Sequence, residues 1–164
     1  MDLKSLINRI DVRAEHDDFE KKYEYKKKEI KKAEVKNIFE TFKKFFKESK
    51  QFKFKENEHS ITAMYRNHTI KLDMDIYKNL DNPSFELNGI IKMFDQKIYD
   101  FTAKGVYTAE LPLPEQDTGE YERIVHDTTF FKDFISGSIS YSFVYILAGS
   151  DIKYNDMKSL LMAL

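Results

Sequence analysis

The spacing of apolar residues changes near residue 51, and this change divides the chain into parts of different secondary structure. Before it, apolar residues recur at intervals of three and four, which is typical of helices with one buried face. After it, they alternate with polar residues, as in "QFKFKE" at 51–56, which is typical of strands with one buried side. We therefore expect an α+β fold in which helices pack against an antiparallel sheet.

Two helices are predicted before residue 51. In the first, from about 2 to 12, four apolar residues share one face: Leu3, Leu6, Ile7 and Ile10. Asp2 is placed to cap its N-terminus. The second, long and Lys-rich, begins at the capping-box-like Asp17 and runs to about residue 49. Its apolar stripe changes direction between residues 31 and 35, so either the helix bends there or its two halves contact different surfaces.

Two hairpins are predicted in the middle of the chain. The first covers 61–77 and turns at 66–68, and the second covers 84–111 and turns near 95–96. One strand face of the first hairpin is made of four apolar residues: Ile70, Leu72, Met74 and Ile76. Gly89 and Gly105 predict bulges or bends in the second.

The last part of the chain returns to the sheet. "YERIVH" at 121–126 reads as a strand, "DTTFFKDFI" at 127–135 as a short helix, and "SISYSFVYIL" at 138–147 as a strand that follows a turn at Gly137. A capped amphipathic helix is predicted from about residue 156. The sheet is then a meander of about six or seven strands, with helices at both ends of the chain packed on it.

We interpret the whole chain, 1–164, as a single domain. Its predicted parts are a helical arm (1–50), antiparallel hairpins (51–109), a surface loop (110–120) and a strand and helix return (121–164). Hydrophobic residues make up 41% of the sequence, which is enough for a core.

Composition excludes several classes of protein. There is no cysteine, which excludes disulfides, thiolate metal ligands and a cysteine nucleophile. The chain begins without a secretory signal pattern, and its longest apolar stretch, "FVYILAG" at 143–149, is far shorter than the ~20 residues that cross a bilayer. We expect a cytoplasmic protein without membrane insertion. The excess of Lys over Arg, with many Ile, Phe, Tyr and Asn, indicates AT-rich codons and hence a low-GC bacterium or its phage.

The strongest charge feature is the segment 21–50, which holds twelve Lys and five Glu, whereas the rest of the chain has an excess of acidic residues. A helix of this charge predicts a protein-binding surface or a face balanced by the chain's own acids. The lysines singled out as partner-binding are Lys26, Lys27, Lys28, Lys31, Lys32 and Lys36. Nucleic-acid binding through the same lysines is the alternative, although the segment has no Arg for bidentate phosphate contacts.

Residues that could support catalysis or metal binding form no recognisable motif. Asp73 and Asp75 lie two apart on a predicted strand, so both carboxylates would point to one side and could share a hard cation. The histidines, His16, His59, His68 and His126, lack zinc-site spacing, although His59 and His68 fall near turns of neighbouring strands. His126 precedes Asp127, a candidate acid–base pair. No cofactor or metal is predicted, and the chain is not expected to be an enzyme.

A curved sheet under a helix can also enclose a small apolar ligand. Five aromatic residues would line such a cavity: Tyr99, Phe101, Tyr141, Phe143 and Tyr145. The function that the sequence favours is nevertheless protein binding, as a regulator, inhibitor or accessory factor. The apolar C-terminus, Leu160 to Leu164, must be buried. A second copy of the chain would supply a surface for it, so a homodimer is also predicted.

Overall fold

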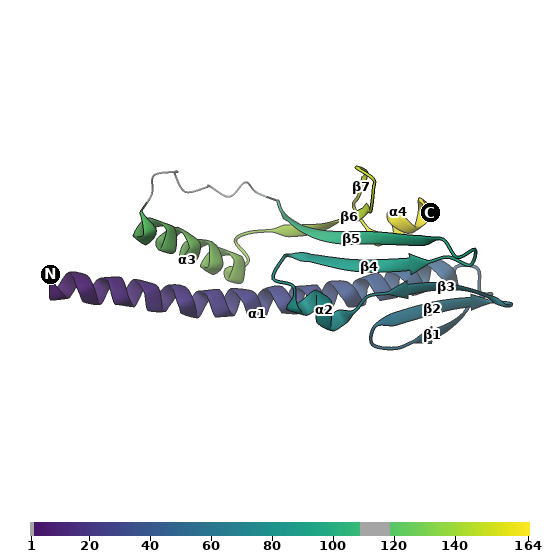
Figure 1. Ribbon diagram of the computed structural model, residues 1–164, viewed down its shortest axis with the longest axis horizontal. Helices are drawn as coiled ribbons and strands as arrows, with labels where there is room; N and C mark the ends of the chain where they lie inside the picture. Colours follow the sequence, from purple (N-terminus) through teal and green to yellow (C-terminus); the bar gives the residue numbers. More distant parts are fainter. Residues whose placement is uncertain (1, 109–118) are drawn as a thin grey trace. The chain divides into compact units, whose positions relative to one another are not determined.

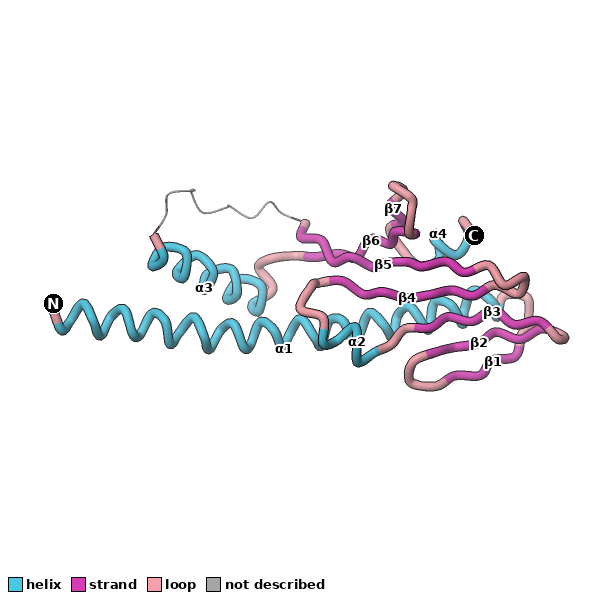
Figure 2. The backbone as a smooth tube through the Cα atoms, viewed as in Figure 1, coloured by secondary structure: helices cyan, strands magenta, loops and turns pink. Residues whose placement is uncertain are grey.

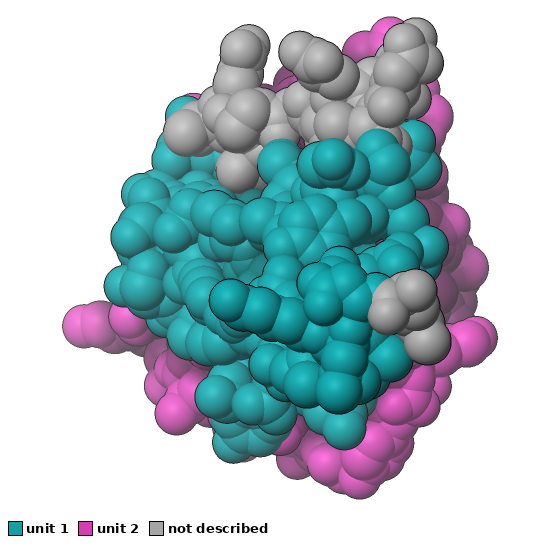
Figure 3. All heavy atoms as spheres, turned by 90° about the vertical axis from the view of Figure 1, so that its left-hand side faces the viewer, with its two compact units in different colours: residues 1–28, 107–141 teal, residues 29–106, 142–164 magenta. Residues whose placement is uncertain are grey.

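Helix α1, Leu3–Lys47, is the longest element of the protein (Figure 1). The computed structural model describes residues 2–108 and 119–164. They form two compact units, which Figure 3 colours separately: a first unit of residues 1–28 and 107–141, and a second of residues 29–106 and 142–164. The predicted α+β fold is confirmed, and Figure 2 shows its helices and strands. Residues 110–118 of the predicted loop lie outside the described residues, and the prediction of a single domain stays a prediction.

In the first unit, the beginning of α1 packs against α3, Glu120–Ser136. The ring of Tyr23 stacks on that of Phe131 with centroids 4.8 Å apart. The hydroxyls of Tyr23 and Tyr107 lie 3.2 Å apart, and burial raises the pKa of Tyr23. Helix α3 ends at Gly137, whose φ of 84° gives the left-handed cap predicted for this turn.

The two predicted N-terminal helices are one. The amide of Ser5 donates to the Asp2 carboxylate at 3.2 Å, which confirms the first cap, but Asp17 lies inside the helix. Because the early part of α1 contacts α3 and the later part contacts the sheet, its two halves face different surfaces, as one alternative predicted.

The predicted strand 121–126 is also wrong, because α3 continues through it. Ile124, Thr128 and Phe131 recur at intervals of four and three and are all at least partly buried. This is helical spacing, which the short β-branched run at residues 124–125 obscured.

In the second unit, the strands pair in the order in which they occur in the chain, as a meander predicts (Figure 1). The seven strands among the described residues are β1 (Lys53–Glu56), β2 (Ser60–Tyr65), β3 (His68–Asp73), β4 (Glu86–Lys92), β5 (Ile98–Tyr107), β6 (Tyr141–Leu147) and β7 (Lys153–Tyr154). The two predicted hairpins are present, with Arg66 and Gln96 at positive φ in their turns. The pairing of β2 with β3 and of β4 with β5 therefore follows from local turn geometry.

The core of the second unit lies between one face of this sheet and two helices. The later part of α1 contributes Val35, Ile38 and Phe42, and the C-terminal helix α4, Met157–Met162, contributes Leu160 and other residues. The hydroxyl of Tyr145 donates to the Glu34 carboxylate, and burial, followed by this contact, raises the pKa of Tyr145.

The N-terminus of α4 gives a first testable prediction. Asp156 caps it, because its carboxylate accepts the Ser159 amide at 2.7 Å, and this hydrogen bond lowers the pKa of Asp156. A carboxyl whose pKa is lower in the folded state stabilises the fold above its unfolded-state pKa of about 3.9, and this stabilisation is lost as the pH falls through the folded-state value. We expect Asp156→Ala to cost about 1 kcal/mol at pH 7 in urea unfolding.

At pH 3 the difference between the wild type and Asp156→Ala should shrink. The control is Asp156→Asn, which keeps a capping oxygen but does not titrate, so its stability relative to Asp156→Ala should not change between the two pH values. An equal loss for Asp156→Ala at both pH values would contradict the assignment.

Candidate functional site

Two of the six candidate lysines are held inside the first unit. The ammonium of Lys26 donates to the carbonyls of Phe134 and Ile135, at 3.1 and 2.8 Å, in the last turn of α3. Lys27 is only 5% exposed and pairs with Glu24 at 3.1 Å. Neither ammonium is therefore presented to an external polyanion.

Lys31 is the most deeply buried of the six, at 1% exposure. Its ammonium donates to the carbonyls of Asn82 and Ser84, at 2.9 and 3.0 Å. Asn82 is the C-cap of α2, Ile76–Asp81. Lys26 and Lys31 thus each supply donors to carbonyls at the end of a second helix, where the backbone lacks donors of its own and a positive charge is favourable.

Lys28, Lys32 and Lys36 are exposed. Lys32 pairs with Glu29 at 3.2 Å, within the helix. Lys32 and Lys36 also line a pocket of about 260 Å³ that includes three carboxylates: Glu40, Glu56 and Glu58. Lys32 and Lys36 therefore lie near acids of the same unit, in line with the expected internal balance of charge.

The first unit leaves one face of α1 unpaired with any described element. At 100° per residue, seven exposed residues of α1 fall within about 60° of each other: Leu3, Ile7, Ile10, Ala14, Lys21, Tyr25 and Lys28. We call them the outer stripe. It lies roughly opposite Tyr23, which packs on α3. Leu3, Ile10 and Tyr25 are 68%, 55% and 69% exposed.

The predicted pair Asp73 and Asp75 is not on one strand. β3 ends at Asp73, and Asp75 is the N-cap of α2, where its carboxylate accepts the Lys78 amide at 3.1 Å. A strand was expected to continue to Ile76 because apolar residues alternate to that point, but the capping aspartate begins a helix instead.

Asp73 and Asp75 nevertheless line one pocket of about 690 Å³ in the second unit. Asp100 and Lys78 line it as well, with three asparagine amides and the hydroxyl of Thr102. Asp73 pairs with Lys71 at 3.3 Å, and the hydroxyl of Thr102 donates to Asn88 at 2.8 Å. The pocket is therefore acidic and rich in oxygen acceptors, but many of these groups already have partners in the chain.

A buried amide supports this pocket. Asn79 donates to the carbonyls of Asp75 and Asn88, at 2.9 and 3.0 Å, and accepts the Asn88 amide at 2.7 Å. Its polar atoms are fully used in joining α2 to β4, so Asn79 has a structural role. Among the described residues, no group of three potential metal ligands occurs at this pocket.

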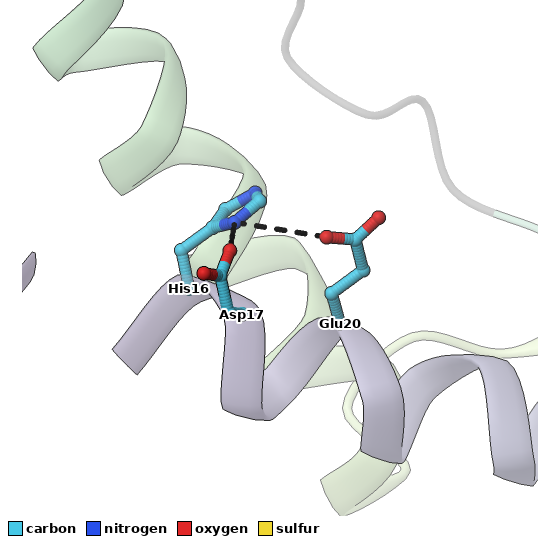
Figure 4. Close-up of side chains that lie close together, drawn as sticks. All are labelled: His16, Asp17 and Glu20. Atoms are coloured by element: carbon cyan, nitrogen blue, oxygen red, sulfur yellow. Dashed lines mark hydrogen bonds and ion pairs between the residues drawn. The ribbon is translucent and has the colours of Figure 1, made fainter. Parts of the chain in front are cut away.

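One such group does occur in the first unit, on α1 (Figure 4). The ligand atoms of His16, Asp17 and Glu20 all lie within 4.8 Å of one another. The Nδ1 atom of His16 is 3.2 Å from a carboxylate oxygen of Asp17 and 3.8 Å from one of Glu20 (Figure 4). This group was not predicted from the sequence, because the first predicted helix ended at about residue 12 and the second began at Asp17. A continuous helix would have shown that His16 and Glu20 are one turn apart.

The other histidines do not form a site. Ser60 pairs with Asp73 and Tyr65 with His68, so the β2–β3 register places His59 and His68 at opposite ends of the hairpin, although both lie near turns. The ring of His59 accepts the Ile76 amide at 3.2 Å. His126 and Asp127 lie on α3, with Nδ1 and Oδ1 3.7 Å apart, and not on a strand.

The aromatic residues proposed to line a ligand cavity are placed differently from one another. Phe101, Phe143 and Tyr145 are buried members of the core, and Tyr99 packs against it. Tyr141 belongs to the first unit and is 39% exposed. Four of the five therefore contribute to packing in the second unit.

Comparisons with known proteins give no functional assignment. No protein-family model matches the chain, and no match was found among curated proteins or among solved structures. Within residues 2–108 and 119–164, every helix is too short or too polar to cross a bilayer.

Proposed function

We propose that the protein is a non-enzymatic protein-binding module, acting as a regulator, inhibitor or accessory factor, and that it binds its partner through the outer stripe of α1. The observation that carries the proposal is the exposure of Leu3, Ile7 and Ile10 on a face of the helix that its own packing does not use. Apolar residues at this spacing are the anchors of helices that bind in a groove of another protein.

The chemistry of the stripe indicates the chemistry of the partner. Its N-terminal part is apolar, and its later part combines the exposed ring of Tyr25 with the ammonium groups of Lys21 and Lys28. Neither lysine forms an ion pair with any described residue. A matching partner therefore presents an apolar groove that continues into a patch of carboxylates.

The contacts of the other lysines support this choice over nucleic-acid binding. Lys26, Lys27 and Lys31 are engaged inside the chain, which removes half of the cationic groups that would neutralise phosphates. An apolar stripe also has no role in following a phosphate backbone, whereas it contributes directly to a protein interface.

We predict that Ile7→Gln with Ile10→Gln weakens partner binding about 100-fold, because each removes an apolar anchor that contributes roughly 1–2 kcal/mol. Glutamine is a good helix former, so α1 should be retained. Lys28→Glu should weaken binding by about tenfold and more strongly at low salt. The measurement is capture from a nuclease-treated bacterial lysate with wild-type and variant chains in parallel, then titration of the purified partner.

The matched control is Lys153→Glu, which reverses an exposed lysine in the second unit and should bind as the wild type does. Capture that is lost on nuclease treatment would overturn the proposal in favour of nucleic acid. Light scattering that shows a dimer dissociated by the double variant would identify a second copy as the occupant instead. Co-sedimentation with anionic vesicles, lost in the same variant, would indicate a lipid surface.

A further inference from the structure

The cluster of His16, Asp17 and Glu20 has the dimensions of a metal site. Zinc binds imidazole nitrogen and carboxylate oxygen at about 2.0–2.2 Å, so two ligands at a tetrahedral angle are separated by about 3.4 Å. The Nδ1 atom of His16 is 3.2 Å from the Asp17 oxygen and 3.8 Å from the Glu20 oxygen. Both separations differ from the ideal value by only a few tenths of an ångström.

The imidazole is held in place by α3, independently of the two carboxylates. The Nε2 atom of His16 faces the Asp127 carboxylate at 4.0 Å, and the ring lies 5.6 Å from that of Phe131. A metal on Nδ1 leaves the ring proton on Nε2, which faces the Asp127 carboxylate. Without metal, Nδ1 is the ring nitrogen within hydrogen-bond distance of a carboxylate, that of Asp17. His16 is also 18% exposed, so its position is set by packing.

From this arrangement we propose that His16, Asp17 and Glu20 bind a divalent transition-metal ion of the zinc type through Nδ1 of the histidine and one oxygen of each carboxylate. Imidazole together with carboxylates suits zinc and its neighbours, whereas magnesium prefers oxygen ligands alone. Three protein ligands leave a coordination position open to solvent. Asp127 is a positioning residue that acts through His16.

The test is a titration of the metal-free full-length chain with Zn²⁺, and separately with Mg²⁺, by calorimetry. A single Zn²⁺ should bind at micromolar concentrations, whereas Mg²⁺ should not bind in the same range. His16→Gln and Glu20→Gln should each weaken Zn²⁺ binding at least tenfold. Asp127→Asn should weaken it by about threefold, less than the loss of a ligand, because Asp127 lies 4.0 Å from Nε2 and acts only through the ring.

Two further measurements distinguish this site from general effects on folding. His68→Gln, which changes an exposed histidine in the second unit, should bind Zn²⁺ as the wild type does. Nitrogen NMR of the His16 ring should show the proton on Nε2 and the metal on Nδ1 when Zn²⁺ is bound, and Asp127→Asn should shift the Nε2 resonance of this Zn²⁺-bound form. Unchanged binding in both His16→Gln and Glu20→Gln, or no Zn²⁺ binding at millimolar concentration, would overturn the proposal. The proposed partner surface does not depend on this outcome.

Discussion

Lys31→Ala is expected to lower the free energy of unfolding by about 3 kcal/mol. The Lys31 ammonium donates to two backbone carbonyls, those of Asn82 and Ser84, in an environment where the side chain is 1% exposed. Hydrogen bonds from charged donors contribute more than neutral ones, at about 1.5–3 kcal/mol each, and Lys31→Ala also removes the contacts of a buried aliphatic stem. Urea unfolding followed by circular dichroism measures the loss.

Two companion variants separate the ammonium from the rest of the side chain. Lys31→Met keeps most of the aliphatic stem and should cost about 2 kcal/mol, because only the hydrogen bonds are lost. Lys32→Ala removes a neighbouring exposed lysine and should change stability by less than about 0.5 kcal/mol. If Lys31→Ala were as stable as Lys32→Ala, the ammonium would have no part in joining α1 to the end of α2.

The strands were predictable because their residues alternate and their turns are local. Phe54, Leu72 and Phe143 each occupy the buried or half-buried side that the period of two assigns to them. The hairpin turns at Arg66 and Gln96 were also found, since a hairpin brings neighbouring segments together without information from distant parts of the chain. The order of the strands in the sheet then follows from the sequence order.

The helices were harder to delimit because local signals compete with packing. Asp17 has the form of a cap but lies within α1, where the neighbouring His16 packs on the ring of Phe131 in α3. Residues 121–126 look like a strand in isolation and become helical because Ile124 and Thr128 face the interior of the first unit. Such tertiary contacts override weak local preferences.

For the candidate partner-binding lysines, the sequence indicated the Lys-rich segment of α1 but not which of its lysines are accessible. Charge density identified the lysines of α1, but it could not distinguish Lys28, which is exposed, from Lys31, which donates to carbonyls 51 and 53 residues away in the sequence. Those acceptors are main-chain groups, and every residue carries one, so no side-chain pattern marks them. The convergence of His16 with Asp127 depends likewise on the packing of two helices that are distant in the sequence.

Gly89→Ala is expected to destabilise the second unit by about 2–3 kcal/mol, the effect of overfilling a packed core. Gly89 pairs with Phe101 across β4 and β5, and the register continues on both sides of it, so the predicted bulge at this position is absent. A Cβ there would lie 2.5 Å from two ring carbons of Phe101 and 3.0 Å from Met74. Because Phe101 is only 2% exposed, its ring cannot move away into solvent.

The decisive measurement is a double-mutant cycle with Phe101→Leu, again by urea unfolding. Alone, Phe101→Leu removes ring contacts and should destabilise the wild type by roughly 1–2 kcal/mol. In the Gly89→Ala background it makes room for the methyl group and should stabilise, so its effect changes sign. Gly105→Ala provides the comparison, because its Cβ would meet the ring of Phe85. Phe85 packs on Phe143, with centroids 5.3 Å apart, but it is less buried than Phe101, so a smaller destabilisation is expected. Additive effects in the cycle would show that Gly89 is required for backbone reasons and not for the space that Phe101 occupies.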